Sequence, residues 1–564
     1  FYTGQKQRPR KAKLDGQKIE CDQAIQDLKE RLATITNTKS RGAIACAGST
    51  RSSLETQAML QWACRTNNWQ SPAFFLDSST TQKVKAAVSR LESDLAVSLR
   101  GIEDADFILV AGADPINEAP MLALALRQAQ QRGADIVVFD PRPISLPFKF
   151  KHLATTPERL NLLAKALVKK AVASDAVKAL GETAVEYYAS MEDRADDFDK
   201  SLAALADKLR DSQRPIIVVG LDVAQQNTPS LFADLALILQ TTEKRVGLFY
   251  LLPGANAFGA GIISNERASF ESIIEGVENG SIKALILVES NPFRHFADRQ
   301  RLENAIDQLE LLVVMDYLDS AAVQKADIFI PTATLYETGG LFLNQEGRIQ
   351  AAPKVHAGGL PIAQTGTGEH PPRIYGARMP GADARAAWEV LAKLTETELP
   401  LEEKPLRANI LNWLSEKIPE FVKMPLLEEF PEDGLRVGLK QDLKLRFSAK
   451  GHEKTKERSD RYQLLLTELT FGTEELSAYS ECLIDLEGTP GIMMCQSDAQ
   501  KMNLTDGDAV SIELDKGTIE ANLHVVGNMA TGILVIPRHK DLDWQKMDTR
   551  KKWIRRDQIR KRKD

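Results

Sequence analysis

The chain has 564 residues, enough for about three or four domains that each bury a core. Its composition is 43% hydrophobic and 27% charged, which excludes a disordered chain, a collagen-like chain and a small disulfide-stapled module. The net charge of −6 argues against nucleic-acid binding unless the basic residues cluster. We find no signal peptide and no apolar run near the ~20 residues that span a bilayer, so we expect a cytoplasmic protein that meets a membrane only through partners.

The five cysteines are scattered along the chain, at Cys21, Cys46, Cys64, Cys482 and Cys495. An iron–sulfur or zinc site needs about four converging ligands, which usually include closely spaced cysteine pairs. The sequence contains no such pair. We therefore expect reduced, mostly buried thiols and no metal site on this chain.

Short apolar runs alternate with helical patterns over the first 400 residues. Runs that predict strands lie at 43–47, 106–111, 136–139, 215–219, 284–288, 311–314 and 327–331, and helical patterns lie at 24–32, 53–66, 83–94 and 120–131. Strands this short and this uniformly apolar, separated by helices, are typical of parallel sheets covered on both faces. The fold class is therefore predicted to be doubly wound α/β.

Polar residues follow three of these strands directly, as Asp114-Pro115, Asp140-Pro141 and Asn291-Pro292. In doubly wound sheets, ligands bind outside the carboxyl ends of the strands. Asp-Pro and Asn-Pro are also common turn formers, so one such loop alone carries little weight. Three of them after predicted strands indicate a ligand site.

The pattern changes beyond these strands. The segment 337–348 is predicted to be a tightly folded loop, and the Pro-, Glu- and Lys-rich stretch that follows at 396–441 a linker with one helix at 406–418. After residue 442, alternating apolar runs at 509–514, 518–526 and 532–537 predict a compact β-barrel.

The last 19 residues, 546–564, hold ten Lys or Arg and three acidic residues. This basic tail is predicted to be a solvated or frayed end, with a docking arm anchored by Trp553 and Ile554 as the alternative. The predicted domains are then 1–100 with 305–395 (first α/β domain), 101–304 (second α/β domain), 396–441 (linker), 442–545 (barrel) and 546–564 (tail).

Several of these segments together resemble the molybdopterin oxidoreductase superfamily. The resemblance rests on Gly112-Ala113-Asp114-Pro115 with Glu118-Ala119-Pro120, on 133–142, on Glu289-Ser290-Asn291-Pro292 and on the loop 337–348. The run 495–510 is similar to the dinucleotide-binding barrel of that superfamily. The resemblance covers roughly residues 14–543 and implies two parallel-sheet α/β domains followed by a β-barrel.

Within the superfamily, 254–261 and 536–539 resemble the large iron–sulfur subunit of NADH:quinone oxidoreductases (complex I). The molybdopterin-like part of that subunit family is generally regarded as having lost its metal. In the family it follows a cysteine-rich cluster region, which is not found in this sequence. The resemblance thus implies a subunit of a redox complex, at the cytoplasmic face of a membrane, with iron–sulfur clusters, FMN and NADH on partner iron–sulfur and flavin subunits.

Active members of the superfamily need a Cys, selenocysteine, Ser or Asp ligand to molybdenum or tungsten. The segment where it is expected, 74–97, contains Asp77, Ser78 and Ser79 but no Cys or His. Soft metals favour thiolates and proton abstraction needs a base, so we predict no metal ligand and no catalytic residue here. Ser78 and Ser79 are the remaining candidates.

The predicted pocket is a vestigial pterin or nucleotide site formed by Gly112, Asp114, Asp140, Arg142 and Asn291. Asp140 could accept hydrogen bonds from a guanine edge while Arg142 neutralises a phosphate. Alternatively, Asp140 caps a helix and Arg142 forms a salt bridge. Three functions stay open: a metal-free scaffold, an active enzyme with molybdopterin guanine dinucleotide and its clusters on another chain, and a nucleotide-binding module without redox role.

Overall fold

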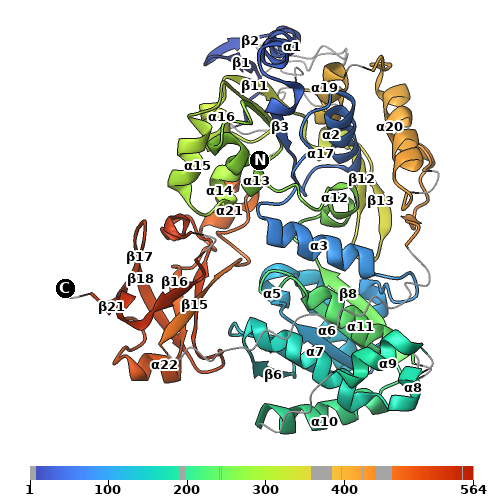
Figure 1. Cartoon of the computed structure of the whole chain (residues 1–564), viewed down its shortest axis with the longest axis vertical. Helices are drawn as coiled ribbons and strands as arrows, with labels where there is room; N and C mark the ends of the chain where they lie inside the picture. Colours follow the sequence, from blue (N-terminus) through green and yellow to red (C-terminus); the bar gives the residue numbers. More distant parts are fainter. Residues whose placement is uncertain are drawn as a thin grey trace, which may run out of the picture. The chain divides into compact units, whose positions relative to one another are not determined.

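The computed structural model describes residues 8–178, 180–190, 197–240, 242, 244–356, 384–395, 397–421, 424–439, 460–548 and 551–562. The chain divides into two compact units (Figure 1). Unit 1 comprises Phe1–Lys85 and Pro253–Gly438, and unit 2 comprises Ala86–Leu252 and Leu439–Asp564.

Unit 1 is built on a six-stranded sheet in the order β2-β1-β11-β10-β9-β3. Its strands are β1 (Ala12–Leu14), β2 (Gln17–Ile19), β3 (Ile44–Ala47), β9 (Ala284–Val288), β10 (Leu311–Asp316) and β11 (Ile328–Pro331). The last four are parallel, and the hairpin β1–β2 extends the sheet antiparallel to β11. β9 lies between β10 and β3 in this sheet, although the predicted boundaries place residues 284–288 in the second α/β domain.

Helices cover both faces of this sheet, and alternate residues of each strand point to opposite faces (Figure 1). Leu285, Leu287 and Val314 pack against α13, α15 and α16 in one hydrophobic core. The helices of unit 1 are α1 (Cys21–Thr38), α2 (Leu54–Thr66), α3 (Ser78–Arg90, which continues into unit 2), α12 (Ala257–Ile263), α13 (Phe270–Glu278), α14 (Pro292–His295), α15 (Arg299–Ile306), α16 (Ala321–Lys325), α17 (Leu335–Thr338), α19 (Ala387–Leu394) and α20 (Glu403–Lys417).

The predicted loop at 337–348 is a β-hairpin instead. Its strands β12 (Gly340–Leu343) and β13 (Arg348–Ala352) pair antiparallel, and β14 (Leu435–Arg436) joins β13. The sequence prediction gave too much weight to the glycines, whereas Leu341 and Leu343 alternate into the core.

The predicted linker also belongs to the folded unit, because Trp413 of α20 stacks on Trp62 of α2 with ring centroids 5.6 Å apart.

Unit 2 contains a parallel five-stranded sheet in the order β6-β5-β4-β7-β8. The strands are β4 (Phe107–Ala111), β5 (Asp135–Asp140), β6 (Lys151–Ala154), β7 (Pro215–Gly220) and β8 (Gly247–Leu251). The chain moves outward from β4 to β6 and then returns to the other side of β4 with β7. This reversal makes the β4–β7 boundary the topological switch point, the usual place for a ligand in such sheets.

Helices cover both faces of this sheet as well. Ile108, Val138 and Val218 pack against α6 in one core, and α7 and α11 cover the opposite face. The helices are α4 (Leu99–Ile102), α5 (Pro115–Glu118), α6 (Pro120–Gln131), α7 (Pro157–Ala171), α8 (Ser174–Lys178), α9 (Glu182–Ala189), α10 (Asp197–Asp211) and α11 (Thr228–Gln240). β6 and the helices between 157 and 211 were not predicted, since their segments mix apolar and charged residues.

The C-terminal part of unit 2 is a nearly closed, barrel-like sheet of seven strands in the order β20-β15-β19-β16-β18-β17-β21. Its strands are β15 (Arg461–Thr467), β16 (Gly491–Cys495), β17 (Ala509–Leu514), β18 (Gly517–Val526), β19 (Ile533–Pro537), β20 (Trp553–Arg555) and β21 (Ile559–Lys561), with the helices α21 (Glu481–Ile484) and α22 (Gln496–Lys501). The two parallel sheets and this barrel confirm the predicted fold class.

The basic tail is part of this barrel rather than a frayed end or an arm. β20 pairs with β15 and β21 pairs with β17, with Ile554 and Ile559 buried. Acidic residues of the preceding strands and turns pair with four basic residues of the tail. The ion pairs are Lys551–Asp515, Arg560–Glu513, Lys561–Asp508 and Arg562–Glu520.

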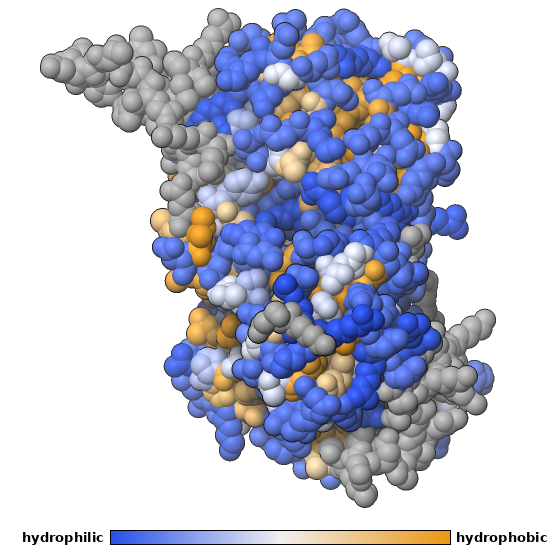
Figure 2. Space-filling model, turned by 90° about the vertical axis from the view of Figure 1, so that its left-hand side faces the viewer, coloured by the Kyte–Doolittle hydropathy of each residue, from blue (hydrophilic) through white to orange (hydrophobic). Residues whose placement is uncertain are grey.

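The described helices include none that is long and apolar enough to cross a membrane. The face shown in Figure 2 is mainly hydrophilic and carries separate small hydrophobic patches. Four of the five cysteines are buried and Cys482 is exposed, which agrees with the predicted mostly buried thiols.

Candidate functional site

The candidate site lies at the switch point of the unit 2 sheet. Gly112 follows β4 and Gly220 ends β7. Because Ala111 pairs with Val219, the next residues, Gly112 and Gly220, lie opposite each other. A Cβ on Gly220 would lie 2.1 Å from the carbonyl oxygen of Gly112, so only glycine lets the two backbones approach this closely. Gly112 has a φ of +69°, which also favours glycine.

Arg142 lies at the centre of this site and is 3% exposed. Its Nε donates to Asp140 Oδ1 at 2.9 Å and its Nη2 to Asp140 Oδ2 at 2.8 Å. Its Nη1 donates to Glu118 Oε1 at 2.8 Å, and Nη2 also reaches the Gly112 carbonyl at 3.3 Å. The guanidinium is therefore held by the carboxylate of Asp140 at the end of β5 and by that of Glu118 in α5, which follows the neighbouring strand β4.

Asp222, which follows β7, extends this network toward the barrel. Its carboxylate lies 3.7 Å from Arg142 Nη1 and 3.2 Å from Arg538 Nη2, and Arg538 also contacts Glu468 at 2.7 Å. We call these six residues the switch-point network; its members are Glu118, Asp140, Arg142, Asp222, Glu468 and Arg538. Within unit 2 it joins the parallel sheet to the barrel, as does the backbone bond from Ala530 N to the Pro141 carbonyl at 3.0 Å.

Burial and mutual charge perturb the titration of this network. Burial and the negative charge of Asp222 raise the pKa of Glu118 to about 7, against the attraction of Arg142. The pKa of Arg142 lies well above its ordinary value, because Asp140 and Glu118 outweigh the burial that would lower it. Neighbouring Asp222 and Glu468 likewise raise the pKa of Arg538 against the effect of its burial. Both arginines are therefore permanently charged.

The structure brings four of the five predicted pocket residues together. Gly112, Asp114, Asp140 and Arg142 share this edge of unit 2, whereas Asn291 belongs to unit 1. Asp114 caps α5, accepting from the Asn117 backbone N–H at 3.3 Å. Asp222 and Arg538 were not predicted as pocket residues. The sequence holds one signal for Asp222, which is its position just after the apolar strand β7, and none for Arg538.

The two interpretations of Asp140 and Arg142 can be compared with this geometry. The salt bridge is present, but Asp140 caps no helix: its Oδ1 accepts the backbone N–H of Arg142 at 2.8 Å in a turn. A guanine edge or a phosphate would need donors and acceptors that are already used inside the chain. The residues present therefore do not fit a pterin nucleotide unless the network first opens.

The carboxyl edge of the unit 1 sheet is closed in a similar way. Arg51 follows β3 and donates to Asp316 Oδ2 at 2.7 Å and to the Glu289 carbonyl at 2.9 Å. Asp316 is fully buried and also accepts the backbone N–H of Tyr317 at 2.7 Å. Burial raises the pKa of Glu289 to about 7 despite the nearby Arg51. Asn291 precedes α14 without a side-chain capping bond.

The segment predicted to lack a metal ligand, 74–97, contains α3, and Asp77 and Ser78 lie at the start of this helix. Asp77 accepts hydrogen bonds from the backbone N–H and the hydroxyl of Thr80, both at 2.8 Å. The hydroxyls of Ser78 and Ser269 lie 3.2 Å apart. Asp77 and Ser78 therefore have local roles in the fold. Throughout the described part of the chain, no three His, Cys, Asp or Glu residues form a group that could hold a metal ion.

The sequence matches the family Molybdopterin oxidoreductase over residues 14–396 and the Molydopterin dinucleotide binding domain over residues 477–551. The first match covers more than half of the chain, so the chain belongs to the molybdopterin oxidoreductase family. The second match falls on the barrel. Both agree with the two parallel sheets and the barrel described above.

Curated relatives are subunits of oxidoreductases. One NADH-quinone oxidoreductase subunit of Pseudomonas fluorescens is 26% identical over 367 residues, which are 62% of this chain and 39% of the relative. The alpha subunit of an NADPH-Fe(3+) oxidoreductase of Geobacter sulfurreducens is 24% identical over 93% of this chain and 64% of the relative. The alpha subunit of an F420-dependent formate dehydrogenase of Methanocaldococcus jannaschii is 22% identical over 86% and 79%. The chain thus spans less than two thirds of the first two relatives.

Among solved structures, acetylene hydratase from Pelobacter acetylenicus has a similar fold. Its TM-score is 0.54, with 13% sequence identity over 94% of this chain and 85% of that chain. At this identity the similarity supports the fold alone.

Proposed function

We propose that this chain is a subunit of a multi-subunit NADH:quinone oxidoreductase or a related NAD-linked redox complex. In this proposal it provides a molybdopterin-oxidoreductase-like scaffold that has lost its metal site. The relatives named as oxidoreductase subunits support the assignment to a redox complex. Iron–sulfur clusters, FMN and NADH are proposed to bind to partner subunits, and the complex to lie at the cytoplasmic face of a membrane.

The observation that carries the scaffold proposal is the closed switch-point network. Arg142 donates to Asp140, Glu118 and the Gly112 carbonyl, so the edge where a nucleotide would bind is filled by the chain's own charges. At the start of α3, Asp77 bonds to Thr80 and Ser78 contacts Ser269. These local bonds support the proposal that neither residue is a metal ligand. Gly112, Asp114, Asp140, Arg142 and Asn291 are thus proposed to be a vestigial pocket.

A second candidate function is an active molybdenum or tungsten enzyme of the formate dehydrogenase type, whose clusters lie on another chain. It is favoured by the dinucleotide-binding match over residues 477–551 and by the formate dehydrogenase relative. In that case molybdopterin guanine dinucleotide would be bound by this chain.

Purification of the tagged chain from its own cells, with its partners attached, separates the two functions. The scaffold proposal predicts co-purified flavin and iron–sulfur subunits, no stoichiometric molybdenum or tungsten, and no pterin released on denaturation. Stoichiometric molybdenum or tungsten together with a released pterin dinucleotide would establish the second function. A nucleotide-binding module without redox role would instead purify alone and bind guanine nucleotides tightly.

A further inference from the structure

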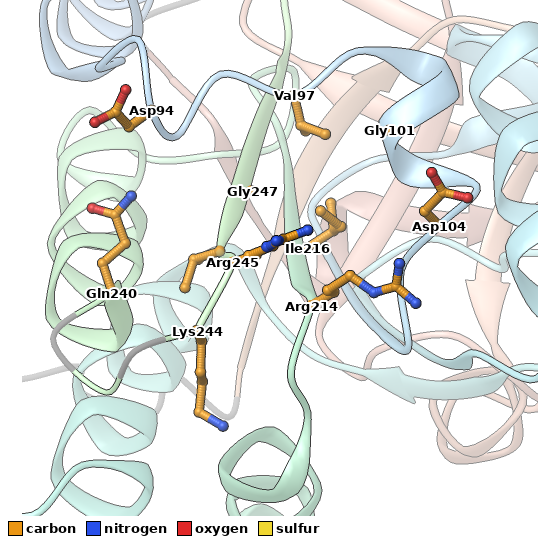
Figure 3. A pocket seen from close by; sticks show the side chains of 11 residues that line it. Asp94, Val97, Gly101, Asp104, Arg214, Ile216, Gln240, Lys244, Arg245 and Gly247 are labelled. Atoms are coloured by element: carbon orange, nitrogen blue, oxygen red, sulfur yellow. The ribbon is translucent and has the colours of Figure 1, made fainter.

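A recess in unit 2 lies at the opposite end of the parallel sheet from the switch point. It has a volume of about 450 Å³ and lies where β7 and β8 begin (Figure 3). Its lining residues are Asp94, Val97, Gly101, Asp104, Arg214, Ile216, Gln240, Lys244, Arg245, Val246 and Gly247. Cavities of this size commonly bind small molecules. The switch-point network contributes no residue to it.

The floor of the recess is apolar and shaped by glycine. A Cβ on Gly247 would lie 2.4 Å from Ile216 Cδ1 and 3.0 Å from Val97 Cβ. Glycine at this position therefore lets Ile216 and Val97 pack together beneath the opening. The recess offers this apolar surface to the body of a ligand.

Two guanidinium groups lie beside this floor. Ile216 pairs with Gly247, so Arg214 and Arg245 precede the two strands at matching positions. In Figure 3 the Arg245 side chain extends toward Ile216, and the Arg214 side chain extends toward the side on which Asp104 lies. Like charges at opposite positions of neighbouring strands repel each other.

Two acidic residues, Asp94 and Asp104, also line the recess. Asp104 is bonded to Arg132 Nη1 at 2.8 Å, and Lys244 donates to the carbonyls of Arg210 and Ser212. The backbone N–H of Arg214 donates to Asp106 Oδ1 at 3.0 Å, but among the described residues neither the Arg214 nor the Arg245 guanidinium forms an ion pair. Guanidinium groups recognise phosphate with two parallel hydrogen bonds, more specifically than lysine does.

We propose that this recess binds a phosphate-bearing small molecule. Arg214 and Arg245 would bind the phosphate, and Val97 and Ile216 would contact the apolar face of the molecule. The site is separate from the proposed vestigial pocket and does not depend on the proposed function.

Calorimetric titration of the full chain at low salt with adenosine 5′-monophosphate, adenosine and inorganic phosphate tests this proposal. We expect the nucleotide to bind at least tenfold more tightly than adenosine, and the variant Arg214→Gln/Arg245→Gln to weaken it at least tenfold. Arg127→Gln, an exposed arginine of α6, serves as the matched control and should bind as the unchanged chain does. Both arginines of the pair are exposed, so the double variant should keep its unfolding midpoint.

Three results would overturn the proposal. One is no binding of either the nucleotide or phosphate, and another is unchanged nucleotide affinity in the double variant. The third is loss of binding in Asp140→Asn but not in the arginine variant, which would place the nucleotide at the switch point. That last result would contradict the vestigial pocket as well, whereas the first two leave the proposed function unaffected.

Discussion

Replacing Arg142 by methionine tests whether the switch-point network stabilises unit 2. Methionine keeps much of the aliphatic volume but removes the donors that contact Asp140 and Glu118 at 2.8–2.9 Å. Those two carboxylates are 0% and 10% exposed, so they would remain buried without their cation. Breaking a buried ion pair in this way costs about 3–5 kcal/mol. We expect the free energy of unfolding of unit 2 to fall by that amount.

Urea denaturation of Arg142→Met at pH 7, followed by tryptophan fluorescence and circular dichroism, measures the loss. Arg132→Met is the matched control, because Arg132 is 52% exposed and pairs with Glu103 and Asp104 at the surface. Surface pairs of this kind contribute about 0–1 kcal/mol. The triple variant Arg142→Met/Asp140→Asn/Glu118→Gln should be more stable than Arg142→Met alone, because no buried carboxylate is left uncompensated.

A loss below about 1 kcal/mol in Arg142→Met would refute this reasoning. So would a triple variant that is less stable than the single variant. Either result would mean that the guanidinium is not needed to balance the buried carboxylates, and the edge would then be available to a nucleotide.

Three further predictions concern other parts of the chain. The pKa of Glu118 is raised to about 7 in the folded state from an ordinary value of 4.5. Between these two pH values the folded state therefore binds more protons than the unfolded state, so the free energy of unfolding falls as the pH rises through this window. Glu118→Gln should flatten that decline in urea midpoints measured from pH 4.5 to 7, and an unchanged slope would contradict the assignment. Ile554→Ala should lower the stability of unit 2 by about 2–4 kcal/mol by denaturation, since Ile554 is 4% exposed, whereas Trp553→Ala should cost less. A maleimide should label one thiol per native chain, Cys482, and all five after denaturation; rapid labelling of native Cys482→Ser would show that a buried cysteine is accessible.

The sequence was sufficient to find much of the site because strand ends are marked locally. Gly112, Asp114 and Asp140 each follow an apolar run, and the register of parallel strands brings such positions to one edge. The sequence could not show which strands are neighbours, so it did not reveal that β7 lies beside β4. The contact between Asp222 and Arg538 links positions 316 residues apart, and no local pattern encodes it.

The same limit explains the errors at the C-terminus and in the hairpin. Ten basic residues in the tail suggested a solvated end because their acidic partners lie in earlier strands and turns, such as Glu513 and Asp515. Once β21 pairs with β17, charges that appear unbalanced in the sequence face opposite charges. In the hairpin, Gly339 and Gly340 suggested a loop although Leu341 and Leu343 fill core positions.

Each unit ends its parallel sheet with one arginine held between acidic groups of neighbouring strands. In unit 1 Arg51 binds the carboxylate of Asp316 and the backbone of Glu289, and in unit 2 Arg142 binds Asp140 and Glu118. A pocket that depended on a bound anion would leave positive charge uncompensated in the empty protein, but these arginines are balanced within the chain. A phosphate placed at either edge would compete with these carboxylates for the arginine. The carboxylates are already buried, so their pairing with the arginine needs no further desolvation. At both edges the arginine is thus paired within the chain, which supports the proposed scaffold role.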